Sequence, residues 1–294
     1  MQGRHHLAKM LETTSVADFL TQYWEKNLLH CVGRRGRFVP LLSWRRLETI
    51  LREQRLAYPR LRLFRSGALV DRARYSTQDG RLQPDDLYRE LSSGATLVLD
   101  CVDEAHRPLR NFAVNCEKFF GCPVNINAYA AWKTQHGFDI HFDTQDNFIL
   151  QIYGRKRWRI WEPTREYPLP SDTAEPPKTS PIWEGPLSDG SLLYIPRGWW
   201  HEASPLGEPS LHLTVSIKPP TGVDFIQSLV FQLRSSIVAR RNLPTLGDAE
   251  ARQQVVDLLR SELAALCVPA RLNLYLSKVR AVRLRRVGCL PRPE

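Results

Sequence analysis

Two histidines and one aspartate in this chain have the types and spacing of a metal-binding site. His141 and Asp143 are separated by one residue, and His201 follows Asp143 by 58 positions. On a β-strand, residues i and i+2 point to the same side, so His141 and Asp143 project together while Phe142 faces away. Two imidazoles and one carboxylate can occupy one face of an octahedral metal ion and leave three positions open, which is the ligand set of non-haem Fe(II) centres. The pattern predicts a metal site formed by these three side chains.

The segments around the three candidate ligands predict short β-strands. A strand-like run covers 147–153, and a second run with alternating character covers 155–161. Before His201, a short apolar strand at 191–195 ends in a tight corner at 196–198. Short strands separated by glycine and proline indicate a closed or double-sheet β structure, whose mouth is a natural cofactor site. The alternative is that three packed or surface side chains converge by accident, and this context disfavours it.

Two long motifs in these segments resemble the JmjC-type cupin oxygenases. They are HFDTQDNFILQIYGRKRW, which begins at His141, and DGSLLYIPRGWWHEA, which begins at Asp189, with SLHLTVSI shortly after. The closest named group is the ribosomal-oxygenase branch, which hydroxylates ribosomal proteins, and residues 18–26 are similar to the entry segment of that branch. The resemblance spans about residues 16–218. It implies a mainly β fold with flanking helices and a double-stranded β-helix core, together with Fe(II), 2-oxoglutarate as cosubstrate and O2-dependent hydroxylation.

The resemblance also implies roles for single residues. His141, Asp143 and His201 match the iron ligands and the catalytic centre. Lys156 matches the basic residue that pairs with the distal carboxylate of 2-oxoglutarate. A dianionic cosubstrate that is held by iron at one end needs a fixed cation for the other. Three further residues match polar positions of the cofactor pocket: Asn127, Tyr129 and Asn147.

Strand alternation adds to this set of pocket residues. It places Lys156 and Trp158 on one face of their strand and the neighbouring arginines on the other, although a solvated basic strand is the alternative. In 211–217, the same alternation points the polar side chains toward the interior, which predicts that Thr214 and Ser216 line the cofactor pocket. His212 shares this face, and a hydrogen-bonded core histidine is an equally good interpretation of it.

Composition excludes several other classes of protein. The six cysteines form no CxxC pair, and the chain has no P-loop or nucleophile elbow in a strand-to-helix setting. We therefore expect reduced thiols in a cytoplasmic protein. No stretch resembles a signal peptide or is long enough to span a bilayer, so a soluble protein without membrane contact is predicted.

The formal net charge of +10 is unevenly distributed. Residues 34–75 contain twelve arginines against three acidic residues, and residues 267–294 carry a net charge of +6. Such basic flanks could attract an anionic partner such as RNA or an acidic polypeptide. Arginine-rich solvated faces are the interpretation we prefer, so direct nucleic-acid binding is not expected.

Hydrophobic periodicity divides the chain into three regions. Residues 1–94 are predicted to form a mixed helix and strand flank, 95–220 the JmjC/cupin catalytic core, and 221–294 a helical region with a basic tail. The predicted helices cover 16–29, 43–53, 84–91, 108–121, 223–240 and 248–267. The last two helices have apolar stripes, which predict homodimerisation, with packing on the outside of the barrel as the alternative.

These observations favour an Fe(II)- and 2-oxoglutarate-dependent hydroxylase that acts on a polypeptide side chain, of a ribosomal protein or a peptide. The proline-rich segment 163–186, predicted as a long loop, and the pair Trp199-Trp200 could form an open groove for an extended chain. Two alternatives remain. One is hydroxylation of a free amino acid or natural product in a closed pocket, and the other is a catalytically silent cupin that acts as a binding module.

Overall fold

The computed structural model describes residues 2–53, 58–133 and 137–286. The chain divides into two compact units. The first unit contains residues 1–120 and 124–218, and the second contains residues 121–123 and 219–294. The three-part division of the chain at residues 94 and 220 stays a prediction.

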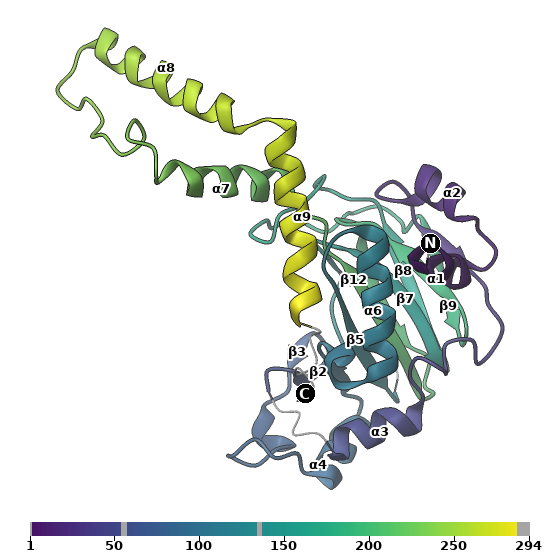
Figure 1. Ribbon diagram of the computed structural model, residues 1–294. Coiled ribbons are helices and arrows are strands. Elements are labelled where there is room, and N and C mark those ends of the chain that lie inside the picture. Colours follow the sequence, from purple (N-terminus) through teal and green to yellow (C-terminus); the bar gives the residue numbers. More distant parts are fainter. Residues whose placement is uncertain (1, 54–57, 134–136, 287–294) are drawn as a thin grey trace, which may run out of the picture. The chain divides into compact units, whose positions relative to one another are not determined.

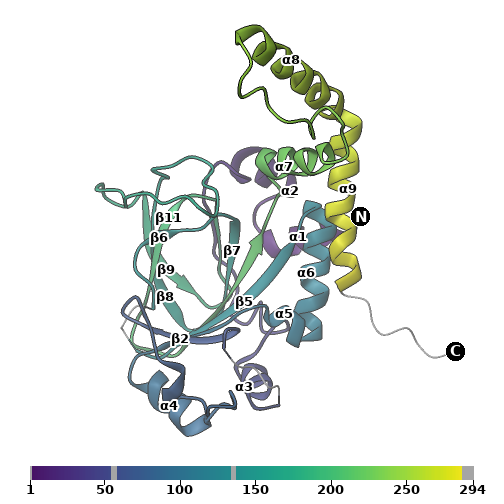
Figure 2. The same ribbon diagram turned by 90° about the vertical axis from the view of Figure 1, so that its left-hand side faces the viewer.

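The first unit is built on two antiparallel sheets that face each other (Figures 1 and 2). The larger sheet has eight strands in the order β1-β10-β7-β12-β5-β4-β2-β3. These strands are β1 (Leu29–Cys31), β2 (Leu61–Arg65), β3 (Ala68–Leu69), β4 (Thr96–Leu99), β5 (Val124–Ala131), β7 (Asp146–Tyr153), β10 (Leu192–Ile195) and β12 (Ser210–Ile217). The smaller sheet has the order β6-β11-β8-β9, with strands β6 (His141–Phe142), β8 (Arg155–Trp161), β9 (Trp183–Ser188) and β11 (Trp200–Pro205).

The space between the sheets contains an apolar core at one end and polar side chains at the other. Ile149 and Leu193 of the larger sheet pack against Trp158, Ile160 and Leu187 of the smaller one. This arrangement confirms the predicted double-stranded β-helix with flanking helices. Because both faces of the larger sheet are covered, β12 is buried along its whole length.

Helices surround the larger sheet, and α6 lies along its outer face in both views (Figures 1 and 2). The helical segments of this unit are α1 (Gln2–Leu11), α2 (Val16–Asp18), the π-helical turn η1 (Phe19–Tyr23), α3 (Trp44–Glu53), the 3-10 turn η2 (Arg72–Arg74), α4 (Pro84–Ser92), α5 (Val102–Ala105) and α6 (Arg107–Phe120). The predicted helices at 43–53, 84–91 and 108–121 correspond to α3, α4 and α6. Helix α1 was not predicted.

The predicted helix over 16–29 is wrong in length, because the helical segment stops before Trp24. The backbone leaves the helical region at Trp24, with ψ of 119°, and Glu25 takes a positive φ of 57°. The apolar stripe was nevertheless a correct guide to packing. The ring of Phe19 lies edge-on against Tyr194 of the larger sheet, with the ring centroids 5.0 Å apart.

The proline-rich loop is shorter than the predicted 163–186, because its last part forms strand β9. Pro186 lies within this strand, opposite Arg157 of β8. A proline is tolerated there because β9 is at the edge of the sheet, where one side of the strand needs no ladder hydrogen bonds.

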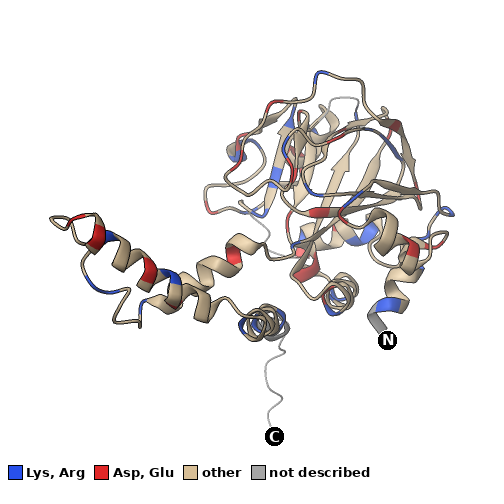
Figure 3. Cartoon of the chain, turned by 90° about the horizontal axis from the view of Figure 1, so that it is seen from above, with Lys and Arg blue, Asp and Glu red and all other residues tan. Residues whose placement is uncertain are grey.

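Many arginines of the arginine-rich flank form local ion pairs, and several of them remain exposed to solvent. Basic and acidic positions are interspersed over this unit in Figure 3. Seven arginines between residues 34 and 75 form ion pairs with carboxylates: Arg35–Asp189, Arg37–Glu12, Arg52–Glu48, Arg60–Glu104, Arg62–Asp100, Arg65–Glu90 and Arg74–Glu90. Several of these pairs join segments that are distant in sequence, so part of the positive charge serves to hold the flank together.

The second unit is helical, as predicted. Its helices are α7 (Gly222–Leu233), α8 (Ala249–Leu266) and α9 (Pro269–Arg286). Helix α8 matches the predicted helix over 248–267 to within one residue at each end. The predicted helix over 223–240 ends at Leu233, and much of the segment predicted as a basic tail is helix α9. Phe225 of α7 packs against Tyr275 of α9, with ring centroids 5.6 Å apart. Residues 287–294 of the predicted tail lie outside the described residues. Among the helices of the described residues, none has the length and apolar character needed to cross a bilayer.

Candidate metal centre and cosubstrate pocket

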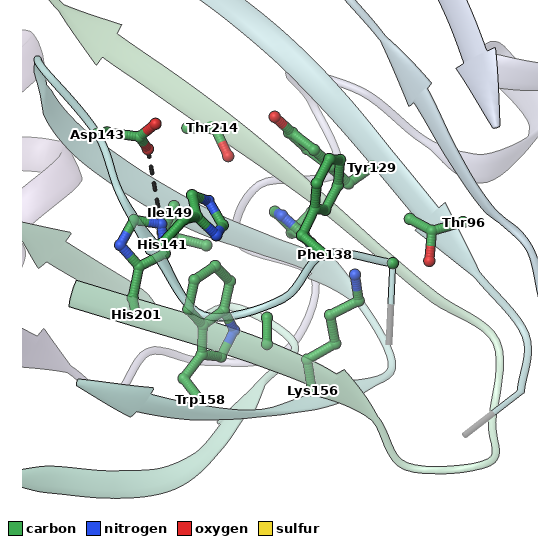
Figure 4. Close-up of a pocket in the computed structure, with 13 residues that line it drawn as sticks. Thr96, Tyr129, Phe138, His141, Asp143, Ile149, Lys156, Trp158, His201 and Thr214 are labelled. Atoms are coloured by element: carbon green, nitrogen blue, oxygen red, sulfur yellow. Dashed lines mark ion pairs between the residues drawn. The ribbon is translucent and has the colours of Figure 1, made fainter. Parts of the chain in front are cut away.

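The three predicted metal ligands meet at one point in the smaller sheet (Figure 4). His141 lies on β6 and is the direct register partner of His201 on β11, and Asp143 follows β6 immediately. Their candidate ligand atoms all lie within 4.8 Å of one another. Phe142 points away and packs edge-on against Trp200, with ring centroids 4.9 Å apart. The i, i+2 geometry inferred from the sequence is therefore the geometry of the site.

Hydrogen bonds orient both imidazoles so that Nε2 faces the centre. The Nδ1 atom of His141 lies 2.7 Å from the carbonyl oxygen of Asp139, and Nδ1 of His201 lies 3.1 Å from that of Trp199. A carbonyl oxygen only accepts, so Nδ1 carries the proton on each ring and the lone pair of Nε2 is available to a metal ion.

The charge state of the site also suits a divalent cation. Burial, reinforced by the nearby His141, lowers the pKa of His201 to about 4, although Asp143 opposes this shift. The His201 imidazole is therefore neutral near pH 7, which is the form that binds metals. Two imidazole nitrogens and one carboxylate fit Fe(II) and leave part of its coordination sphere open.

The three side chains lie at one end of a cavity of about 250 Å³ between the sheets. Of the predicted pocket residues, the lining includes Lys156, Tyr129 and Thr214 as well as the triad (Figure 4). The remaining lining residues are Thr96, Gly137, Phe138, Ile149, Trp158, Ala203 and His212. Thr96, Gly137 and Phe138 were missed by sequence reasoning, because they come from outside the recognisable motifs and no periodicity marks them.

Among the described residues that line the cavity, Lys156 is the only one with a long basic side chain, and it is 3% exposed. No ion pair or hydrogen bond of its ammonium group is found among the described residues. Burial lowers the pKa of Lys156 to about 7. The neighbouring arginines of β8 point outward, where they pair with Glu208, Glu184 and Glu202. The alternation predicted from the sequence is confirmed, and the alternative of a solvated basic strand is wrong for Lys156.

Other polar groups of the lining also lack partners. Three atoms are buried without a hydrogen bond among the described residues: Thr96 Oγ1, Trp158 Nε1 and His212 Nδ1. The His212 ring stacks on Tyr129 with centroids 4.8 Å apart. Burial, followed by the charge of Lys156, keeps the pKa of His212 well below its usual value. Buried polar atoms usually have hydrogen-bond partners, so these three atoms are suited to contact a polar ligand in the cavity.

The other predicted pocket residues lie beside the cavity rather than on its lining. The side-chain oxygen of Asn127 accepts hydrogen bonds from the backbone N–H of Cys101 at 3.0 Å and from Asn125 at 3.3 Å. Asn147 donates to Asp143, and Ser216 donates to Asn147. Contact of these three residues with a cofactor stays a prediction.

The expected aromatic groove beside the metal site is not formed, because Trp199 and Trp200 are both buried. Trp199 belongs to the core between the sheets. The indole N–H of Trp200 donates to the hydroxyl of Thr164 at 2.9 Å, which ties the start of the long loop to β11. The two tryptophans therefore position the ligand-bearing strand and offer no surface to an extended peptide.

Comparison with known proteins agrees with this geometry. Residues 105–225, which include the triad and Lys156, match the JmjC domain family. This chain contains a JmjC domain. Among known proteins, the bifunctional lysine-specific demethylase and histidyl-hydroxylase NO66 of Drosophila pseudoobscura pseudoobscura is 30% identical over 225 residues. The NO66 protein of Drosophila erecta is 26% identical over 298 residues.

The matched region makes up most of this chain but less than half of each relative. The first match covers 73% of this chain and 23% of the relative, and the second covers 92% and 44%. This chain thus spans less than half the length of these two relatives. Among solved structures, the Escherichia coli ribosomal oxygenase YcfD in complex with cobalt and 2-oxoglutarate superimposes with a TM-score of 0.63 at 21% identity. The superposition covers 91% of this chain and 71% of YcfD. It shows that the JmjC domain of this chain has the same fold as YcfD.

Substitution of a triad residue should remove metal binding while the fold survives. In His141→Ala or Asp143→Ala, one of three ligands is lost from an already open site, so we expect Co(II), used as a stand-in for Fe(II), to bind at least roughly 100-fold more weakly. Calorimetric titration with Co(II) measures this change, and circular dichroism checks the fold. His30→Gln, on β1 and outside the cavity, is the control. Wild-type Co(II) affinity in a folded Asp143→Ala variant would contradict the assignment.

Proposed function

We propose that this chain is an Fe(II)- and 2-oxoglutarate-dependent oxygenase that hydroxylates a polypeptide side chain, with succinate and CO2 as coproducts. One observation carries the proposal. A single cavity contains three metal-ligand side chains and, on β8, a buried lysine without an anionic partner among the described residues. An oxidation cosubstrate with two carboxylates needs both features.

The residues of the cavity have separable tasks. His141, Asp143 and His201 would hold Fe(II), which, when bound, supplies the activation of O2 coupled to oxidative decarboxylation of 2-oxoglutarate. Lys156 would bind the distal carboxylate of the cosubstrate and so fix its orientation. The apolar walls, which include Ile149 and Trp158, exclude water from this pair of charges and strengthen their attraction.

The charge of Lys156 depends on the ligand. A pKa of about 7 means that the ammonium group is only partly protonated at neutral pH without a partner. A carboxylate placed against it favours the charged form and raises the pKa again. The lysine is therefore destabilising in the empty pocket and stabilising in the filled one, which is the behaviour of a binding residue rather than a structural one.

Three considerations support a polypeptide substrate. The NO66 relatives are named as a demethylase and histidyl-hydroxylase, and YcfD is a ribosomal oxygenase. Both names refer to action on protein side chains or the ribosome. The cavity of about 250 Å³ is lined by the three metal ligands, and a volume of this size suits an inserted side chain better than a whole peptide segment. The burial of Trp199 and Trp200 removes one argument for a peptide groove, so hydroxylation of a free amino acid or natural product remains the second candidate.

Loss of the Lys156 charge should weaken 2-oxoglutarate binding and stabilise the empty protein. In Lys156→Met, a charge-assisted contact worth roughly 2–3 kcal/mol is removed, so we expect an affinity for 2-oxoglutarate about 30- to 100-fold lower, with Co(II) affinity unchanged.

The same substitution should change thermal stability in a pH-dependent way. The folded pKa of about 7 lies below the usual 10.5, so the free-energy cost of burying the charged Lys156 is complete below pH 7 and is relieved as the pH rises toward 10.5. The Met variant should therefore melt at a higher temperature than the wild type at pH 7, with a smaller difference at pH 9.

The pH dependence of binding provides a second measure of the same group. Above pH 7, Lys156 must take up a proton when the carboxylate binds, so wild-type affinity for 2-oxoglutarate should fall by up to about tenfold per pH unit. Calorimetry between pH 6.5 and 8.5 measures this trend, which Lys156→Met should lack. Arg157→Met, on the exposed face of the same strand, is the matched control. Unchanged cosubstrate affinity in Lys156→Met would show that another group holds the distal carboxylate.

Hydroxylation itself should be visible as a mass increase of about 16 Da in the substrate. We expect this shift in ribosomal proteins or peptides incubated with the protein, Fe(II), 2-oxoglutarate and O2, and not in free amino acids. The Asp143→Ala variant is the control for non-enzymatic oxidation. Modification of a free small molecule with every polypeptide unchanged would favour the second candidate. Absence of succinate formation under all conditions would favour a silent binding module.

We also propose that the second unit mediates homodimerisation. Several large apolar side chains of this unit are more than half exposed, namely Val230, Phe231, Ile237, Leu243 and Leu246. Exposed apolar side chains that gather into one patch mark protein–protein contacts, so we infer that these residues form such a patch. We expect the full chain to be a dimer at micromolar concentration in light scattering and Phe231→Glu to shift it toward the monomer. Gln254→Glu, which adds the same charge at an exposed polar position of α8, should leave the dimer intact. A monomeric wild type would contradict the proposal.

A cytoplasmic location is proposed from the state of the thiols. Cys31, Cys101 and Cys267 are free thiols, and Cys31 is buried. Proteins of reducing compartments keep their cysteines in this form. Recovery of the native protein only from a secreted or periplasmic fraction would contradict this location.

A further inference from the structure

The carboxylate of Asp143 is connected to two buried side chains of the larger sheet. Asn147 Nδ2 donates a hydrogen bond of 2.6 Å to Asp143 Oδ2, and Ser216 Oγ donates one of 2.8 Å to Asn147 Oδ1. Asn147 and Ser216 are 1% and 2% exposed, whereas the Asp143 side chain is 32% exposed. Asn147 on β7 and Ser216 on β12 are direct register partners. Two central strands of the larger sheet, β7 and β12, are thus connected by hydrogen bonds to Asp143, which follows the edge strand β6 of the smaller sheet.

The charge of Asp143 fixes the direction of both hydrogen bonds. An ionised carboxylate only accepts, so the amide of Asn147 must present its NH2 group to Asp143. The amide oxygen then faces Ser216, whose hydroxyl must donate. A flipped amide would place two acceptor oxygens 2.6 Å apart, which is repulsive. The order of donors therefore follows from the ionised ligand and does not depend on an arbitrary choice of amide orientation.

We propose that Ser216 and Asn147 form a relay that positions Asp143 as a metal ligand through one oxygen, an inference that rests on the proposed function. The oxygen that receives the amide hydrogen bond, Oδ2, is also the one that lies 3.6 Å from Nε2 of His201. The terminal torsion of an aspartate is soft, so a free carboxylate can rotate and bind a metal with both oxygens. The amide restrains this rotation.

One-oxygen binding by Asp143 is what the proposed reaction requires. Two imidazoles and one oxygen would leave three of six positions open on a bound ion, and 2-oxoglutarate and O2 together would need all three. A second aspartate oxygen would occupy one of them. Asn147 is therefore a positioning residue, and this role agrees with its place beside the cavity rather than on its lining.

Gln151 provides a matched control for the relay. It lies on the same strand and the same face of β7 as Asn147 and is fully buried, but its side-chain amide donates to the backbone oxygen of Tyr153 at 2.9 Å. Replacing Gln151 removes a comparable buried hydrogen bond without touching a metal ligand. A loss that arises from general weakening of β7 would appear in both variants.

The test is a Co(II) titration of the full chain, followed by titration of 2-oxoglutarate into the Co(II)-loaded protein. Loss of a hydrogen bond to a ligand typically weakens metal binding by about 10- to 100-fold, and we expect this for Asn147→Ala. Ser216→Ala should have a smaller effect in the same direction, Ser216→Thr should restore affinity by keeping the hydroxyl, and Gln151→Ala should bind Co(II) as the wild type does. Co(II)-loaded Asn147→Ala should also bind 2-oxoglutarate at least about tenfold more weakly, although Lys156 is intact.

Several results would overturn the relay. One is a folded Asn147→Ala variant with wild-type affinities, and another is an equal loss in Gln151→Ala. If Asn147→Ala does not fold, equal affinities of Ser216→Ala and Ser216→Thr would have the same meaning. Failure of the wild type to bind Co(II), or binding that His141→Ala does not change, would instead overturn the proposed function. Wild-type binding that depends on His141 but not on Asn147 would overturn the relay alone.

Discussion

The pairing register of β6 and β11 is the constraint on which the site depends. His141 and His201 are direct partners across these two strands, so both imidazoles project to the same side of the smaller sheet. A slip of one residue between the two strands would turn one of the two histidines outward and bring Phe142 or Trp200 into the cavity in its place. The corner before β11 helps to fix the register, because the N–H of Gly198 donates to the backbone oxygen of Asp143 at 2.9 Å. Gly198 has a φ of +86° and lies against Pro168, so a side chain there would meet both strain and a clash.

The interior of the barrel contains both an apolar core that stabilises the fold and buried polar groups that destabilise it. Part of it is close-packed apolar core, whose burial stabilises the fold, while the cavity contains a buried lysine and three buried polar atoms without partners among the described residues. Groups of this kind reduce stability, and a fold tolerates them only when the rest of the core is large. The eight-stranded sheet provides that core, since β7 and β12 are buried on both faces.

Local sequence rules were sufficient for the residues whose position depends on one strand. The i, i+2 spacing placed His141 and Asp143 together, and alternation along β8 placed Lys156 inside and its arginine neighbours outside. The Asn147–Ser216 hydrogen bond was not predictable in this way, because it depends on which residues β7 and β12 align, and register is a property of the folded sheet. Trp199 and Trp200 were misplaced for a related reason. Aromatic residues beside a ligand suit either a binding surface or a core, and only the packing of the long loop decides between them.

The metal ligands and the residues that support them come from different sheets, which links metal binding to folding. The smaller sheet and the residue after β6 supply the three ligands, whereas the larger sheet supplies the hydrogen bond to Asp143 and the Tyr129–His212 wall. Neither sheet contains a complete site, so the geometry exists only when the two are packed face to face. A metal ion that bridges elements in this way favours the assembled state over any state in which the sheets separate.

The packing of the two sheets also sets the distance between the triad and Lys156, and therefore the length of the dicarboxylate that can connect the two. Selection of the cosubstrate is in this sense a property of how the two sheets pack, and not of the motif residues alone.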